Sequence, residues 1–185
     1  CKVIGIGDNV VDKYVNLGQM FPGGQCMNFA VYARMLGYES AYMGVFGTDA
    51  AADLVKRTAA KFGVSLERAV TRKGENGYAR INVHDDGDRE FIMSNKGGIA
   101  GTDPLVLSDA DLEYVKPFKL IFTDDNARMN MQVELPKMAS TGVPIIYDFS
   151  VRGTDEALAR ICPHLAYSIL SCGGLSREET IARMH

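Results

Sequence analysis

The stretch Gly23–Gly47 reads GGQCMNFAVYARMLGYESAYMGVFG, and it combines a glycine pair, an apolar helical pattern and a short strand. A glycine pair lets the backbone approach a ligand closely, because no Cβ is in the way. The free N–H groups at the start of the following helix, expected at Cys26–Leu36, can meet electronegative oxygens. Asn28 adds a side chain that both donates and accepts hydrogen bonds, which suits a sugar hydroxyl. This stretch predicts a small-ligand site at the beginning of a helix.

Apolar strands alternate with helices along the rest of the chain. We expect strands at residues 2–6, 41–46, 119–123, 144–149 and 166–170, and helices at residues 26–36, 51–62, after 108, before 142 and at 155–161. Pro136 should kink or shorten the helix that contains it. Continuous apolar strands that alternate with helices predict an α/β fold with a mainly parallel, doubly wound sheet and helices on both faces.

The segment 77–94 has a different pattern. Ala79, Ile81 and Val83 alternate with polar neighbours, and a turn at residues 85–88 precedes a second strand. This period of two predicts a half-exposed hairpin outside the main sheet. One face of such a hairpin is expected to lie over a ligand or against a second subunit.

Composition excludes several classes of partner. The net charge is −3 with no basic run, which argues against a nucleic-acid surface, and no apolar run is long enough to span a membrane. The four cysteines form no C-x-x-C pair and the three histidines share no metal-ligand spacing, so we predict neither a disulfide framework nor a metal site. Reduced thiols are typical of a cytoplasmic protein.

Asp8, Asn9 and Asp12 follow the first strand directly. Ligands of open α/β sheets bind beyond the carboxyl ends of the strands, and carboxylates accept hydrogen bonds from sugar hydroxyls. The alternative is a simple turn, because Asp and Asn are common at the ends of strands. The glycine pair and Asn28 favour the binding site.

Together, GDNVVD at Gly7–Asp12 and the stretch Gly23–Gly47 resemble the sugar-binding half of the ribokinase-like (PfkB) carbohydrate kinases, with Cys26 at a position where Gly, Ala or Pro is usual. The turn at His84–Phe91 is most similar to the fructoselysine 6-kinase branch. The resemblance implies a ribokinase-like fold with a β-sheet lid built from about 13–20 and 77–94, which often pairs two subunits into a homodimer. It implies substrate contacts from Asp8, Asn9, Asp12, Gly23, Gly24, Gln25, Asn28, Tyr78, Arg80 and Asn95.

The resemblance also implies the activity and its cofactors. These kinases use ATP and Mg²⁺, and this branch phosphorylates a primary hydroxyl of a ketose or ketose-derived amino sugar; fructokinase or another ribokinase-like kinase is the alternative. Asp148 and Arg152 resemble a D-x-N-x-R segment near the phosphate path, with Ser150 in place of Asn, although a structural Asp–Arg pair is a second interpretation. Glu178 and Glu179 lie where the family has an element that orders magnesium.

One part of the family's pattern is missing. A G-A-G-D motif, whose Asp serves as the catalytic base, does not occur in the 185 residues. We therefore expect residues 1–185 to be the substrate-binding portion of one ribokinase-like domain, inactive alone, with the C-terminal nucleotide-binding portion absent. The alternative is a non-catalytic sugar-binding fragment.

Overall fold

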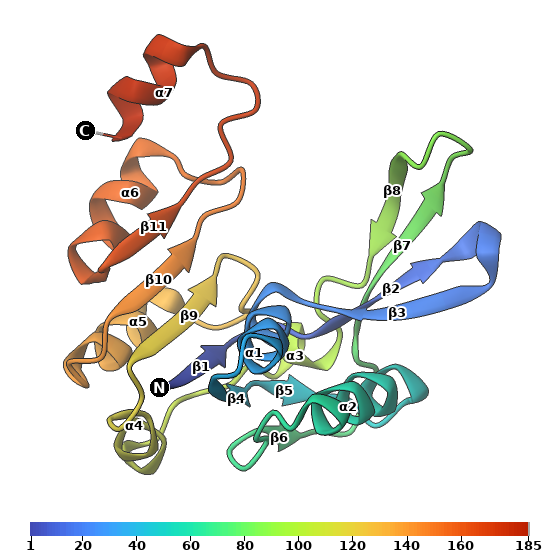
Figure 1. Cartoon of the computed structure of the whole chain (residues 1–185), viewed down its shortest axis with the longest axis horizontal. Coiled ribbons are helices and arrows are strands. Elements are labelled where there is room, and N and C mark those ends of the chain that lie inside the picture. Colours follow the sequence, from blue (N-terminus) through green and yellow to red (C-terminus); the bar gives the residue numbers. More distant parts are fainter. Residues whose placement is uncertain (185) are drawn as a thin grey trace.

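Strand β1 (Lys2–Ile6) is almost wholly apolar and lies inside the main sheet. The computed structural model, which describes residues 1–184, places it between β4 (Glu39–Met43) and β9 (Leu120–Asp124). Strands β10 (Ile145–Asp148) and β11 (Tyr167–Ile169) continue the sheet, giving the order β11-β10-β9-β1-β4 with all neighbours parallel. The structure confirms the predicted parallel α/β sheet (Figure 1).

The expectation of one strand over residues 41–46 was wrong. β4 ends at Met43, and the next two residues form β5 (Val45–Phe46), which pairs with β6 (Val70–Thr71) in a separate sheet. The break falls at Gly44, where a Cβ would lie 2.0 Å from the Tyr42 hydroxyl and 2.3 Å from the Gly7 carbonyl oxygen. Glycine is therefore needed at the break, where the turn after β1 lies close to the backbone.

The helices cover the two faces of the main sheet and enclose two apolar cores. Helices α1 (Gln25–Met35) and α2 (Ala50–Phe62) pack with Tyr42 and Phe122 on one face. The helices that pack on the other face are α3 (Ile99–Thr102), α4 (Asp109–Val115), α5 (Met131–Ser140) and α6 (Asp155–Ile161). The short helix η2 (Cys162–His164) and α7 (Arg177–Met184) complete the helices of the described chain.

Side-chain caps fix where several helices begin. The Asp49 carboxylate accepts a hydrogen bond from the Ala52 amide at the start of α2, and Ser108 forms a reciprocal capping box at the start of α4. Helix α5 continues through Pro136 to Ser140, so the proline does not end it. No helix within residues 1–184 is both long and apolar enough to cross a membrane.

A mixed sheet projects from the main sheet, as Figure 1 shows. Its strands are β2 (Val10–Tyr14), β3 (Gln19–Gly23), β7 (Gly77–Val83) and β8 (Arg89–Ser94), in the order β3-β2-β7-β8. The hairpin predicted at 77–94 is thus separate from the main sheet, as expected. The lid segment expected at residues 13–20 comprises the end of β2, the short 3-10 helix η1 (Val15–Leu17) and the beginning of β3.

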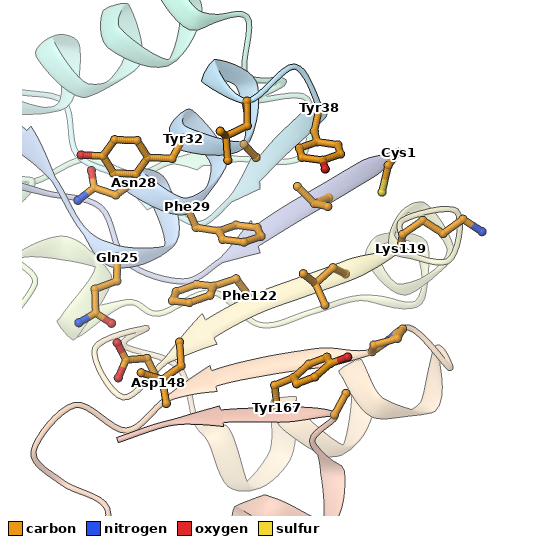
Figure 2. A pocket seen from close by; sticks show the side chains of 17 residues that line it. Cys1, Gln25, Asn28, Phe29, Tyr32, Tyr38, Lys119, Phe122, Asp148 and Tyr167 are labelled. Atoms are coloured by element: carbon orange, nitrogen blue, oxygen red, sulfur yellow. The ribbon is translucent and has the colours of Figure 1, made fainter. Parts of the chain in front are cut away.

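In the described residues 1–184, a groove rather than a helix lies over β10 and β11 on the face of the main sheet that carries α1. Helix α1 packs over β1, β4 and β9, and the Phe29 ring stacks on the Phe122 ring with their centroids 4.9 Å apart. Beyond this pair lies a groove of about 900 Å³, which extends over β9 and β10 to the exposed Tyr167 of β11 (Figure 2). Its lining is mostly apolar, with Gln25, Asn28 and Asp148 at one end.

Helix α1 crosses β1 so closely that Gly5 has no room for a side chain. A Cβ at this position would lie 2.1 Å from the Cys26 carbonyl oxygen. We expect Gly5→Ala to destabilise the protein by about 1–3 kcal/mol or more, because overpacking must displace backbone. Urea unfolding would measure this. Gly173→Ala is the matched control, since no atom lies within 4 Å of a Cβ built there. Equal stability of both variants would contradict the close crossing.

Candidate functional site

The turn between β1 and β2 meets the first turn of α1 at the carboxyl edge of the main sheet. The Asp8 Oδ1 atom accepts a hydrogen bond from the Cys26 amide at 2.9 Å. Gly24 has a φ of 97°, and a Cβ there would lie 2.7 Å from the Asn9 Cα and 2.9 Å from the Asp8 carbonyl oxygen. Only glycine satisfies both constraints, which explains the second residue of the glycine pair.

Cys26 fills the space beneath this turn. Its side chain is fully buried, and its Sγ donates a hydrogen bond to the Ile6 carbonyl oxygen at 3.2 Å. Burial, followed by the nearby charges of Asp124 and Asp8, raises the pKa of the thiol well above its ordinary value. The thiol is therefore protonated and acts as a small packing group.

Asn9 is buried and lines the small cavity beside Asp8, and its Oδ1 has no hydrogen-bond partner within residues 1–184. Its amide nitrogen donates to the Tyr42 hydroxyl and to the Val45 carbonyl oxygen, both at 2.8 Å. The Tyr42 hydroxyl in turn donates to the Gly7 carbonyl oxygen at 2.7 Å. The side chain of Asn9 thus holds the turn that positions Asp8.

Asp124 at the end of β9 was missed by the sequence analysis, although it also follows an apolar strand. Its side chain is fully buried, and its Oδ1 accepts a hydrogen bond from the Asn126 amide. The Gln25 amide nitrogen, in the orientation that satisfies both partners, donates to Asp124 Oδ2 at 2.8 Å and to Asp148 Oδ2 at 3.1 Å. Gln25 therefore links the beginning of α1 to the ends of β9 and β10.

Burial disfavours the charged forms of the neighbouring Asp8 and Asp124 carboxyl groups at this edge. Burial, and then the charge of Asp8, raises the pKa of Asp124 to about 9, and burial also raises the pKa of Asp8. One oxygen or sulfur atom from each of Asp8, Cys26 and Asp124 lies within 4.8 Å of the others. Because Asp124 is protonated at neutral pH and the thiol donates to a carbonyl, this group does not suit Mg²⁺, which requires oxygen ligands.

A cavity of about 240 Å³ lies between this edge and the mixed sheet. Asp8 lines it from the main sheet, together with Arg128 and Arg152 from the loops after β9 and β10. Phe91 and Ser94 of β8 line it from the mixed sheet. The fold therefore brings residues from distant parts of the sequence around one small space.

Asp12 shares a face of the mixed sheet with the residues that line this cavity. It pairs with Ala79 of β7, which pairs with Ser94 of β8, and directly paired residues point to the same face. The Asp12 carboxyl is half-buried, and burial raises its pKa against the opposing charge of Arg89. Gly23 lies beside this carboxyl, since a Cβ built there would be 3.5 Å from Oδ2, an ordinary contact distance.

Of the residues expected at the site, Arg80 and Asn28 lie away from the small cavity, whereas Tyr78 borders it. Arg80 is exposed on the opposite face of β7 from Ala79, because neighbouring side chains alternate. Tyr78 borders the cavity and packs on the α1–α2 core, with the Lys13 ammonium 3.9 Å from its ring centroid. Asn28 is exposed in the larger groove rather than in the small cavity (Figure 2).

Asn95 holds the backbone where the mixed sheet returns to the core. Its Oδ1 accepts a hydrogen bond from the Tyr78 amide, and its Nδ2 donates to the Asn76 carbonyl oxygen, both at 2.8 Å. The side chain therefore stabilises the entry to β7.

The residues expected on the phosphate side of the site lie in different places and have different hydrogen-bond partners. Asp148 accepts hydrogen bonds from Gln25 and the Ser150 amide, whereas Arg152 donates to Asn126 Oδ1 at 3.0 Å. No ion pair joins Asp148 to Arg152 in residues 1–184. The second interpretation, in which these two residues form a structural Asp–Arg pair, is therefore wrong. The Glu179 carboxylate caps α7 by accepting a hydrogen bond from the Ser176 amide, and Glu178 is exposed beside it; neither residue lines the cavity.

Comparisons with known proteins agree with this architecture. The structure is similar to that of the Arabidopsis thaliana ribokinase complexed with ribose and ATP, with a TM-score of 0.63 and 22% identity over 86% of this chain and 57% of that chain. The fold is therefore ribokinase-like. Residues 3–165 match the family of pfkB family carbohydrate kinases, and the chain belongs to this family.

Two curated relatives show which kinds of sugar kinase this chain is similar to in sequence. The chain is 36% identical over 178 residues to the fructosamine kinase FrlD of Bacillus subtilis (strain 168), covering 96% of this chain and 62% of the relative. It is 27% identical over 168 residues to the fructoselysine 6-kinase of Escherichia coli (strain K12), covering 90% and 61%. The chain thus spans less than two thirds of the length of both relatives.

The raised pKa of Asp124 predicts a pH dependence of stability. A carboxyl whose pKa is higher in the folded than in the unfolded protein binds more protons when folded, so its contribution weakens as the pH rises from about 4 to about 9. We expect Asp124→Asn, which resembles the protonated acid, to reduce this loss. Urea unfolding at several pH values between these limits would measure it. An unchanged slope in the variant would contradict the assignment, and the exposed Asp86→Asn is the control.

Proposed function

We propose that the whole protein is an ATP-dependent kinase that phosphorylates a primary hydroxyl of a ketose or of a ketose-derived amino sugar such as fructoselysine. The main support is the cavity between the carboxyl edge of the main sheet and the mixed sheet, where Asp8 and the face that carries Asp12 meet. Family membership supports phosphoryl transfer to a sugar. The names of the two relatives, a fructosamine kinase and a fructoselysine 6-kinase, favour the amino sugar over plain fructose.

ATP and Mg²⁺ are proposed as the cofactors. The structure of the similar ribokinase is a complex with ribose and ATP, which supports the nucleotide. Phosphoryl transfer generally uses Mg²⁺ to neutralise charge on the phosphate oxygens. We assign no residue of this chain to the ion, because the buried carboxyls do not suit it and Glu179 caps a helix.

We further propose that a C-terminal portion of the protein supplies the catalytic base and the nucleotide site. The groove beside α1 supports this, because parallel sheets of this type are normally covered by helices on both faces, whereas β11 is exposed here and the groove side of β10 is only partly buried (Figure 2). The polar end of the groove, with Gln25 and Asp148, lies at the edge where the cavity is found. Residues 1–185 alone are then inactive.

Asp12 provides the test of the sugar site. In the whole protein, we expect ATP consumption only when a sugar such as fructoselysine and Mg²⁺ are present. Asp12→Ala should abolish sugar phosphorylation and leave ATP binding intact, since losing a charged hydrogen-bond acceptor costs about 1.5–3 kcal/mol, roughly ten- to a hundredfold in binding. Asp53→Ala, at an exposed position of α2, should behave as the wild type. Loss of ATP binding with sugar binding unaffected would show that the site is misplaced.

We also propose that two copies of the protein pair through their mixed sheets. Phe91, Ile92, Met93 and Phe21 of this sheet are between 41% and 64% exposed. Apolar side chains gathered on one small sheet are typical of an interaction surface. Light scattering should give the mass of a dimer for the whole protein, and Phe91→Ser with Ile92→Ser should give a monomer. A monomeric wild type would overturn this proposal.

A further inference from the structure

Asp8, Cys26 and Asp124 form a compact group of metal-ligating side chains beneath the first turn of α1. One oxygen or sulfur atom from each residue lies within 4.8 Å of the other two, although the three residues are far apart in the sequence. All three side chains are buried, with exposed fractions of 6%, 0% and 0%. The fold thus brings two carboxyl groups and a thiol to one buried point, a combination that the kinase function does not use.

Hydrogen bonds from neighbouring groups orient both carboxyl groups. Asp8 Oδ1 accepts from the Cys26 amide at 2.9 Å. Asp124 accepts from the Asn126 amide at 2.9 Å and from the Gln25 side chain at 2.8 Å. A carboxylate has about four lone-pair positions, so each group keeps positions for a further ligand. Outer hydrogen bonds of this kind normally support the carboxylates that bind metal ions.

A buried acceptor without a partner lies beside this group. Asn9 is 3% exposed, and its Oδ1 has no hydrogen-bond partner within residues 1–184. Its Nδ2 donates to the Tyr42 hydroxyl and to the Val45 carbonyl oxygen, which fixes the orientation of the amide. Burial, and after it the charges of the three ligand residues, raises the pKa of Tyr42, so the amide borders the group. Buried acceptors in native proteins are normally satisfied, and a bound ion is one way to satisfy them.

The two carboxyl groups also need a positive charge between them. Neither Asp8 nor Asp124 forms an ion pair in the part of the chain that the structure describes. The positive charge of Arg128 acts on Asp8, but its effect on the pKa is smaller than that of burial. A cation bound by both carboxyl groups would relieve the repulsion between them.

We propose that Asp8, Cys26 and Asp124 bind Zn²⁺, with water or the Asn9 Oδ1 atom as the fourth ligand. Zn²⁺ accepts thiolate and carboxylate ligands at about 2.0–2.3 Å, so each ligand atom has to move by less than about 1 Å. Bonds from sulfur and oxygen to zinc replace the S–H bond of Cys26 and the O–H bond of Asp124, and both protons go to solvent. Cys26 stands where the family usually has Gly, Ala or Pro, so this site is particular to the chain. It does not depend on the proposed kinase function.

The test uses the whole protein under reducing conditions, without sugar or nucleotide. Co²⁺ replaces Zn²⁺ as a spectroscopic probe, because a thiolate bound to Co²⁺ gives a charge-transfer band in the near ultraviolet. Calorimetry then measures Zn²⁺ affinity and the protons released. The variants are Cys26→Ala, which carries a side chain usual in the family, and Asp124→Asn, which keeps the shape of the acid. Cys172→Ala, which removes a thiol outside the group, is the matched control.

We expect wild type and Cys172→Ala to show the band and to release about two protons for each Zn²⁺ bound. Cys26→Ala should lose the band, and both site variants should bind Zn²⁺ at least about a hundredfold more weakly, since losing even an outer partner of a ligand costs about ten- to a hundredfold. Thermal unfolding without metal shows whether each variant is folded, and Asp124→Asn tests the site even where Cys26→Ala does not fold. A full band in Cys26→Ala, unchanged affinity in Asp124→Asn, or no Zn²⁺ binding by wild type overturns the proposal.

Discussion

The close contact between the first turn of α1 and the turn after β1 determines the rest of the structure. Three backbone segments meet there with no space for side chains, at Gly5, Gly7 and Gly24. The hydrogen bond from the Cys26 amide to Asp8 then satisfies one of the free N–H groups at the helix start, with a carboxylate from the neighbouring turn. Because the same turn leads into β2, this contact sets the position of the mixed sheet relative to the main sheet.

The site derives its chemistry from the crowding that this contact produces. Asp8, Asp124 and Asp148 end three strands of one parallel sheet, and such strand ends converge on one edge. Burial and the charge of Asp8 raise the pKa of Asp124 to about 9, and Gln25 links Asp124 and Asp148 to α1. The acidic cluster consequently ties the strand ends and α1 together at the edge where the cavity lies.

Much of the fold was predictable, because its signals are local. The apolar strands and the half-exposed hairpin have the periods that their environments impose, and the glycine pair before α1 indicated a close backbone approach. The break at Gly44 was missed because it is caused by Tyr42 and Gly7 in space, not by a pattern along the strand. Asp124 and Arg128 were missed for a similar reason: their loop resembles an ordinary turn, and only the folded sheet brings it beside Asp8. Arg80 was expected at the site because the alternation of a strand does not say which of its faces is turned toward a ligand.

Four short connections join the mixed sheet to the rest of the protein, and each contains a glycine. The chain leaves the core at Gly7, returns at Gly24, leaves again at Gly77 and returns at Gly97. Since β2 and β7 are hydrogen-bonded to each other, the two excursions form one unit. A side chain larger than glycine at any of these four positions would press against its neighbours, so it would shift the mixed sheet relative to the main sheet and change the width of the cavity.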